Sequence, residues 1–170
     1  MRAPYPARIV REILSFTQSS MASSSIPTPA VTATSGPVPA RWTDLVLLAL
    51  RVVAGLMYAC HGGQKLFGWF GGPSEHGGSV PLLSIMGLAS VLEFFGGLLI
   101  AVGLSTRAVA FVLAGEMAVA YLMVHASRGF FPIVNRGESV VLYCFIFLAL
   151  WAVGPGAYSL DGRRGLARTL

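Results

Sequence analysis

Four long apolar segments follow one another in the second part of the chain, at residues 44–67, 80–102, 106–126 and 138–153. None of them alternates between apolar and polar positions, as the strands of a membrane barrel do, so we predict four helices. A helix rises about 1.5 Å per residue, and about 20 residues therefore cross the hydrocarbon layer. The first three segments reach that length and the fourth is a little shorter. The pattern predicts an all-α integral membrane four-helix bundle.

The residues on either side of these segments differ from them in composition. Serines and prolines are frequent in residues 1–40, and no apolar period is sustained there, so we expect a disordered N-terminal tail. Arg8, Arg11 and Glu12 interrupt the apolar run that a secretory signal peptide requires, so no cleavage for export is expected. Residues 41–161 then make up the membrane domain, and residues 162–170 a short basic tail.

The composition of the chain agrees with a membrane protein. Apolar residues make up 55% of it and charged residues only 11%, whereas soluble domains contain about 25% charged residues. An ordinary soluble domain is therefore excluded. The formal charge of +5 comes mostly from arginines in the tails and turns, so we expect no nucleic-acid partner.

The basic residues near the segment ends also predict an orientation. The side that holds both termini carries five of them and the other side three, which places both termini in the cytoplasm. The five are Arg41, Arg107, Arg163, Arg164 and Arg168, and the three are Lys65, Arg128 and Arg136.

Three ionisable residues fall deep inside the predicted helices: Arg51, Glu93 and Glu116. Charges at membrane depth are costly unless they are paired or hydrated, so each is a candidate functional residue. Counting along the helices lets Arg51 approach one of the two acids. One interpretation is an internal ion pair that stabilises the bundle. The other is that one carboxyl group stays protonated and exchanges its proton with a redox partner or a solute, which makes these three the candidate catalytic residues.

A second set of polar residues is expected at the opposite end of the bundle, where it could bind a polar ligand. Its members are Tyr58, His61, Gln64, Lys65, His125, Asn135 and Glu138. Lys65 is the only lysine in the chain, and a compact ammonium group suits a point contact with an anion or an acid. The alternative is that Lys65 extends its ammonium to the membrane surface and the histidine is an ordinary interfacial hydrogen bonder. His61, His125 and Glu138 lack the tight spacing of a helical metal motif, so no metal is expected.

Cys60 and Cys144 have no CxxC or zinc-site spacing. Similar counting places both at one depth, so a redox pair remains an alternative to two small packing residues.

The order of motifs along the chain resembles the DoxX family of small four-helix membrane proteins. The resemblance covers residues 45–161 and rests on Arg51-x-x-x-Gly55, His61-Gly62-x-Gln64-Lys65-Leu66-Phe67-Gly68, Glu93-Phe94-x-Gly96-Gly97, Gly103-Leu104-x-Thr106-Arg107, His125-x-x-x-Gly129-Phe130, Asn135-x-Gly137-Glu138 and Gly154-Pro155-Gly156-x-Tyr158-Ser159-Leu160-Asp161. It implies an inner-membrane protein. Some members are similar to a quinone-reducing subunit of a thiosulfate-oxidising enzyme, and others look like partners of periplasmic or secreted redox and sulfur-handling proteins.

These features lead to a functional hypothesis: a subunit of a membrane redox complex, non-autonomous as an enzyme, with an intramembrane polar pocket. The pocket would take a quinone headgroup or a small sulfur species, because a quinone combines an apolar ring with oxygens that need hydrogen-bond donors. The expected partners are the lipid bilayer, other proteins of the complex and this polar-headed ligand. The alternatives are a non-catalytic membrane scaffold that anchors partner proteins and, less favoured because no inverted repeat is visible, a small-solute or proton transporter.

Overall fold

The computed structural model describes residues 8–9, 11–12, 15, 38–74 and 77–165, in two compact units that divide after Pro37. In the first unit, residues 8–9, 11–12 and 15 have helical backbone, and Arg8 Nε lies 3.7 Å from Glu12 Oε1. Most of the tail that we expect to be disordered, and residues 166–170 of the basic tail, lie outside the described residues.

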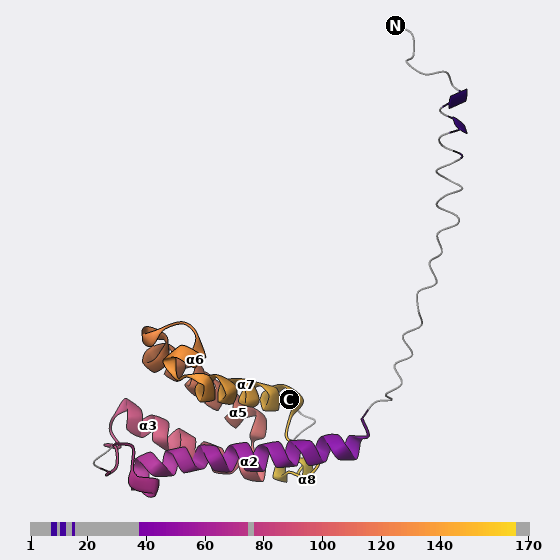
Figure 1. Cartoon of the computed structure of the whole chain (residues 1–170). Coiled ribbons are helices and arrows are strands. Elements are labelled where there is room, and N and C mark those ends of the chain that lie inside the picture. Colours follow the sequence, from indigo (N-terminus) through magenta and orange to yellow (C-terminus); the bar gives the residue numbers. More distant parts are fainter. Residues whose placement is uncertain (1–7, 10, 13–14, 16–37, 75–76, 166–170) are drawn as a thin grey trace. The chain divides into compact units, whose positions relative to one another are not determined.

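The second unit is built from four helical segments (Figure 1). They are α2 (Ala40–Phe67); α3 (Ile85–Val91) continued by η2 (Leu92–Gly96) and α4 (Gly97–Val102); α5 (Thr106–Ala120) continued by η3 (Tyr121–His125) and η4 (Ala126–Arg128); and α7 (Glu138–Val153). Three short elements lie between or after them, namely η1 (Trp69–Gly71), α6 (Pro132–Asn135) and α8 (Leu160–Arg163). The first three segments are long and apolar enough to cross a membrane, and α7 is a shorter apolar helix. The predicted all-α membrane bundle is confirmed, and no strand occurs in the described parts of the chain.

The second segment begins later than its apolar pattern predicts. Its helix starts at Ile85, although the apolar run starts at residue 80. Ser84 caps this start, because its hydroxyl accepts a hydrogen bond from the Gly87 backbone N–H at 3.0 Å. The Ser84 hydroxyl also donates to the Pro81 carbonyl at 2.6 Å, which holds the preceding residues in a turn.

The four segments pack as two pairs, α2 with α3–α4 and α5 with α7 (Figure 1). In the first pair the backbones meet directly at Gly55 and Gly97, where a Cβ on Gly97 would lie 2.5 Å from the Gly55 carbonyl oxygen. Such close approach is possible because glycine has no side chain. In the second pair, buried side chains such as Leu113, Phe147 and Leu150 fill the contact.

We expect Gly97→Ala to destabilise the bundle by about 1–3 kcal/mol, because the new methyl group would overlap backbone atoms of Gly55 and Ala59 that cannot rotate away. The matched control is Gly115→Ala, since a Cβ there has no atom within 4 Å. The measurement is the denaturation midpoint of each variant in mixed micelles. Equal midpoints for the two variants would contradict the close contact.

Two of the helical segments contain a π-helical turn, η2 and η3. In a π-helix, backbone hydrogen bonds join residues five positions apart. Such a turn inserts a residue and changes the direction in which side chains leave the helix, and it is frequent at functional sites. Glu93 lies in η2 and His125 ends η3. Both residues are among those that the sequence marks as candidates.

Candidate functional site

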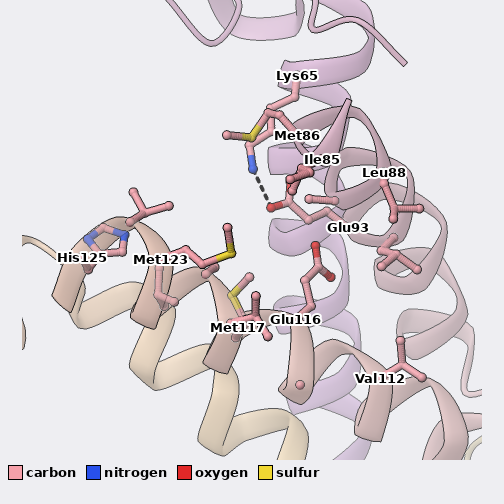
Figure 2. A pocket seen from close by; sticks show the side chains of 17 residues that line it. Lys65, Ile85, Met86, Leu88, Glu93, Val112, Glu116, Met117, Met123 and His125 are labelled. Carbon is pink, nitrogen blue, oxygen red and sulfur yellow. Dashed lines mark hydrogen bonds and ion pairs between the residues drawn. The ribbon is translucent and has the colours of Figure 1, made fainter. Parts of the chain in front are cut away.

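An ion pair between Lys65 and Glu93 occupies the interior of the bundle. Lys65 lies near the C-terminal end of α2, and side chains on a helix lean toward its N-terminus, so the long lysine side chain extends back into the bundle. Its Nζ lies 2.5 Å from Glu93 Oε1 (Figure 2). The Glu93 side chain is only 6% exposed, and its second oxygen, Oε2, is buried with no hydrogen-bond partner among the described residues. Glu93 therefore keeps one acceptor free inside the protein.

A second acid, Glu116 on α5, lies beside this pair. The Tyr58 hydroxyl donates a hydrogen bond to Glu116 Oε2 at 3.0 Å, and Tyr58 itself is buried against Tyr143 and Phe147. The other oxygen, Glu116 Oε1, is buried and has no partner in the part of the chain that the structure describes. In Figure 2 the Glu116 carboxyl group points toward Glu93. Two acids and one lysine thus share this interior region.

An apolar groove of about 460 Å³ adjoins these groups and lies between the α3–η2 segment and the α5–η3 segment. Most of its lining is aliphatic or methionine, and Lys65, Glu93, Glu116 and His125 provide its ionisable groups (Figure 2). Several lining side chains are also exposed on the outside of the bundle, including Ile85 and Met123. In a membrane these side chains meet lipid, so the groove opens toward the acyl chains.

A smaller hollow of about 140 Å³ adjoins the ion pair. It shares Lys65, Glu93, Met117 and Val140 with the groove. Its remaining lining residues are Tyr58, His61, Ser139 and Tyr143, all of them polar. The Lys65–Glu93 pair therefore lines both spaces, and polar residues make up a larger share of the lining of the hollow than of the groove.

The expected approach of Arg51 to Glu93 or Glu116 is wrong. Arg51 is fully buried, but its guanidinium donates to carbonyl groups: Ile100 at 3.4 Å, Ala101 at 3.3 Å and Tyr158 at 2.7 Å. These carbonyls belong to the end of α4 and to the segment after α7, at the opposite end of the bundle from Lys65. Depth counting alone could not show this, because it fixes the level of a residue but not the direction of its side chain. Arg51 is a structural link here.

Asp161 completes this link at the same end. Its carboxylate accepts hydrogen bonds from the backbone N–H groups of Ser105 at 2.8 Å and Thr106 at 2.7 Å, where α5 begins. A carboxylate at a helix N-terminus satisfies free N–H groups and interacts favourably with the helix dipole. Together, Arg51 and Asp161 tie the C-terminal segment to the α4–α5 turn.

The polar residues expected to gather at the other end do not form one site. Gln64 donates to the Gly72 carbonyl at 3.1 Å and so holds the loop after α2. Glu138 is exposed at the start of α7 and lines neither the groove nor the hollow. His61 lines only the small hollow, where its ring meets Tyr143 edge-on. Of this set, Lys65 reaches Glu93 and Tyr58 reaches Glu116.

Asn135 and His125 belong to a hydrogen-bond network that holds the loop before α7. The Asn135 amide donates to the Gly129 carbonyl at 2.7 Å and to the Tyr121 hydroxyl at 3.1 Å, and its oxygen accepts from Gly137 N–H at 2.8 Å. His125 Nδ1 lies 3.0 Å from the Asn135 carbonyl oxygen. The His125 ring lies at the edge of the groove, apart from Glu93 and Glu116 (Figure 2). The Asn135 side chain therefore has a structural role, because its hydrogen bonds hold this loop.

Neither a thiol pair nor a metal cluster is present among the described residues. Cys60 and Cys144 are both free, and the Cys144 thiol lies 3.4 Å from the Ala114 carbonyl oxygen. Counting along the helices predicts that the two cysteines lie at the same depth. In the structure, however, Cys60 is exposed on α2 while Cys144 packs toward α5. No group of three histidine, cysteine or acidic side chains in the described ranges could hold a metal ion.

Two features of the site are not evident in the sequence alone. Tyr143 and Ser139 line the hollow although nothing in the pattern singles them out, because α7 is apolar on all sides. The π-helical turns also have no sequence signal that we can identify. The only sequence feature that marks Tyr143 and Ser139 is weak: each is a polar residue in an otherwise apolar helix.

Comparison with known proteins gives two matches. The sequence model of the DoxX family matches residues 46–126. A Haemophilus influenzae protein whose name is "Uncharacterized protein" is 39% identical over 128 residues, which cover 72% of this chain and 93% of the relative. No solved structure matches the chain. Because the family model covers the Lys65, Glu93 and Glu116 segments and the similarity to the relative extends further, the chain belongs to the DoxX family.

Proposed function

We propose that the groove binds the headgroup of a membrane-dissolved quinone, and that the protein serves as a subunit of a membrane redox complex. The observation that carries the proposal is a pair of buried carboxyl oxygens beside an apolar groove, Glu93 Oε2 and Glu116 Oε1, neither of which has a hydrogen-bond partner in the described part of the chain. Buried polar atoms are nearly always hydrogen-bonded, so two free acceptors beside one cavity point to a missing partner. The missing partner must be a hydrogen-bond donor, and the hydroxyl of a quinol, the reduced form of a quinone, can supply it.

The chemistry of the site suits a quinone better than a small sulfur anion. The walls are aliphatic, which favours a ring and an isoprenoid chain over a hydrated ion. Lys65 has three N–H donors and uses one on Glu93, so others remain for a quinone oxygen. Two acids beside a single lysine leave an unbalanced negative charge unless one carboxyl carries a proton, and a protonated carboxyl is both a donor and a proton source.

The proposal includes the location of the protein. We place it in the inner membrane with both termini in the cytoplasm, because basic residues are more numerous at that end. Lys65 and the mouth of the groove then lie in the half of the membrane away from the cytoplasm. The other proteins of the complex would supply and accept electrons.

We expect Glu93→Gln and Glu116→Gln each to reduce the quinone and quinol bound per protein by up to about tenfold, because a neutral amide oxygen accepts a weaker hydrogen bond from a quinol hydroxyl than a carboxylate does, by about 1.4 kcal/mol at most. The measurement is quinone extracted from protein purified in native lipids, expressed relative to the co-purified phospholipid. Glu138→Gln is the matched control, because this glutamate is exposed and lies outside the groove.

The proposed function is refuted by two results. One is wild-type protein that carries no more quinone than its lipid does. The other is an equal loss in Glu138→Gln and Glu116→Gln. Retention of partner proteins by wild type without any bound quinone would favour a scaffold instead.

A further inference from the structure

The two spaces that share the Lys65–Glu93 pair differ in the residues that line them. The groove is lined mainly by aliphatic side chains and opens toward lipid, whereas six of the eight residues around the hollow carry a polar group beside their aromatic or aliphatic parts. A purely structural ion pair needs no polar space beside it. The hollow places hydrogen-bonding side chains next to Glu93.

The hollow has an exposed boundary as well as a buried one. Tyr58 and Glu93 form its buried wall, while His61 on α2 and Ser139 at the start of α7 are exposed. Ser139 follows the exposed Glu138, and the loop that precedes α7 carries Arg136. The polar residues of the lining therefore run from the buried Tyr58 and Glu93 to the exposed start of α7.

Size and lining suit water. A water molecule occupies roughly 30 Å³ in the liquid, so a hollow of about 140 Å³ has room for a short chain of them. Each buried water needs about two to four polar partners. The hydroxyls of Tyr58, Ser139 and Tyr143 and the His61 ring provide such partners along the hollow.

We propose that this hollow is a hydrated proton port, through which Glu93 exchanges protons with the aqueous phase at the Lys65 end of the bundle, with His61 at its mouth. The orphaned Glu93 Oε2 is the acceptor inside, since Lys65 holds Oε1. In each transfer an N–H bond of the His61 imidazolium breaks, each water of the chain accepts one proton as it gives up another, and one O–H bond forms at Oε2. The neutral His61 ring then takes up a proton from the aqueous phase. No electron moves in this step.

Every titratable group facing Glu93 takes part in the charge balance of the port. Lys65, Tyr58 and His61 come from α2, Glu116 from α5 and Tyr143 from α7. Lys65 is the one cation in this group when His61 is neutral, so a proton arriving at Glu93 or Glu116 removes the excess negative charge. This gives the port a physical driving force that does not depend on the ligand.

The port extends the proposed function, and its role rests on that function. Protons would reach the quinone through the hollow, while the quinone enters the groove from the lipid. Its existence is tested separately, in nanodiscs made from quinone-free lipid. Failure of the quinone experiment therefore leaves the port test intact, and the reverse also holds.

The first test is thiol labelling in a Cys60→Ser, Cys144→Ser background. We expect Tyr143→Cys to react with a charged, membrane-impermeant maleimide at least tenfold faster than Leu142→Cys. Leu142 is the more exposed of the two side chains, but it faces outward from the span, where lipid excludes the reagent. Equal rates, or faster labelling of Leu142→Cys, would overturn the proposal.

The second test measures proton exchange itself. We expect the infrared C=O band of a protonated carboxyl, removed by Glu93→Gln or Glu116→Gln, to exchange into D₂O about tenfold more slowly in Ser139→Leu than in wild type. Ser127→Leu is the control, because Ser127 is exposed in η4 and does not line the hollow. Absence of such a band, unchanged exchange in Ser139→Leu, or equal slowing in Ser127→Leu would each contradict a port.

Discussion

Replacing Lys65 with methionine is expected to lower the free energy of unfolding by about 3–5 kcal/mol, the usual cost of removing one partner from a buried ion pair. The reason is that Glu93 would keep a buried carboxylate with neither oxygen bonded, since Oε2 already has no partner among the described residues. The measurement is denaturation in mixed micelles, followed by circular dichroism. Arg128→Met is the control, because Arg128 is an exposed cation in η4.

A double-mutant cycle distinguishes the pair from a simple loss of packing. If the ion pair is the cause, Lys65→Met combined with Glu93→Gln recovers most of the lost stability, because no unpaired charge is left. A double variant that is as unstable as the sum of the two single variants would show that the pair contributes nothing by itself. The Lys65–Glu93 contact would then be incidental.

Replacing Arg51 with methionine is the other substitution with a large expected effect. Methionine fills similar space but leaves the carbonyls of Ala101 and Tyr158 without the Arg51 donor, while the Ile100 carbonyl keeps the Gly103 backbone N–H at 3.1 Å. Each carbonyl left unsatisfied costs about 1–3 kcal/mol, so we expect a total loss of a few kcal/mol. Because Arg51 contacts neither the groove nor the hollow, bound quinone per folded protein should not change.

Arg107→Met is the matched control for this prediction. Arg107 lies at the same end but donates only at 3.5 Å to the Val153 carbonyl, in an exposed setting. Denaturation midpoints and quinone content are measured for both variants. A loss of quinone from folded Arg51→Met protein, at unchanged stability, would return Arg51 to the ligand site and contradict its structural assignment.

The candidate site was partly predictable. Glu93, Glu116 and Lys65 stand out in the sequence because ionisable residues are rare inside apolar helices. Their grouping is not predictable from the sequence. Counting along the helices assigns Lys65 to one end of the bundle and the two acids to a site with Arg51. The error has one cause: a lysine side chain is several ångströms long, and its direction along the helix decides which level it reaches.

The loop residues show the same limit in another form. In the sequence, Asn135 and Gln64 are candidate ligand-binding residues because they are polar and lie near the ends of predicted membrane segments. In the structure both satisfy backbone groups of loops, Asn135 at Gly129 and Gly137 and Gln64 at Gly72. Near a membrane, backbone groups outside helices must find partners within the protein, and side-chain amides are suited to that task.

The sequence by itself determined the class of this protein, its four apolar segments and its rare internal charges, because lipid solvation acts on each residue separately and leaves its record in composition and periodicity. Only the tertiary structure decided that Lys65 rather than Arg51 meets Glu93, and that the Lys65–Glu93 pair lines both the apolar groove and the smaller hollow. Those outcomes depend on side-chain directions and on contacts between distant helices, such as Gly55 against Gly97, which no local pattern encodes.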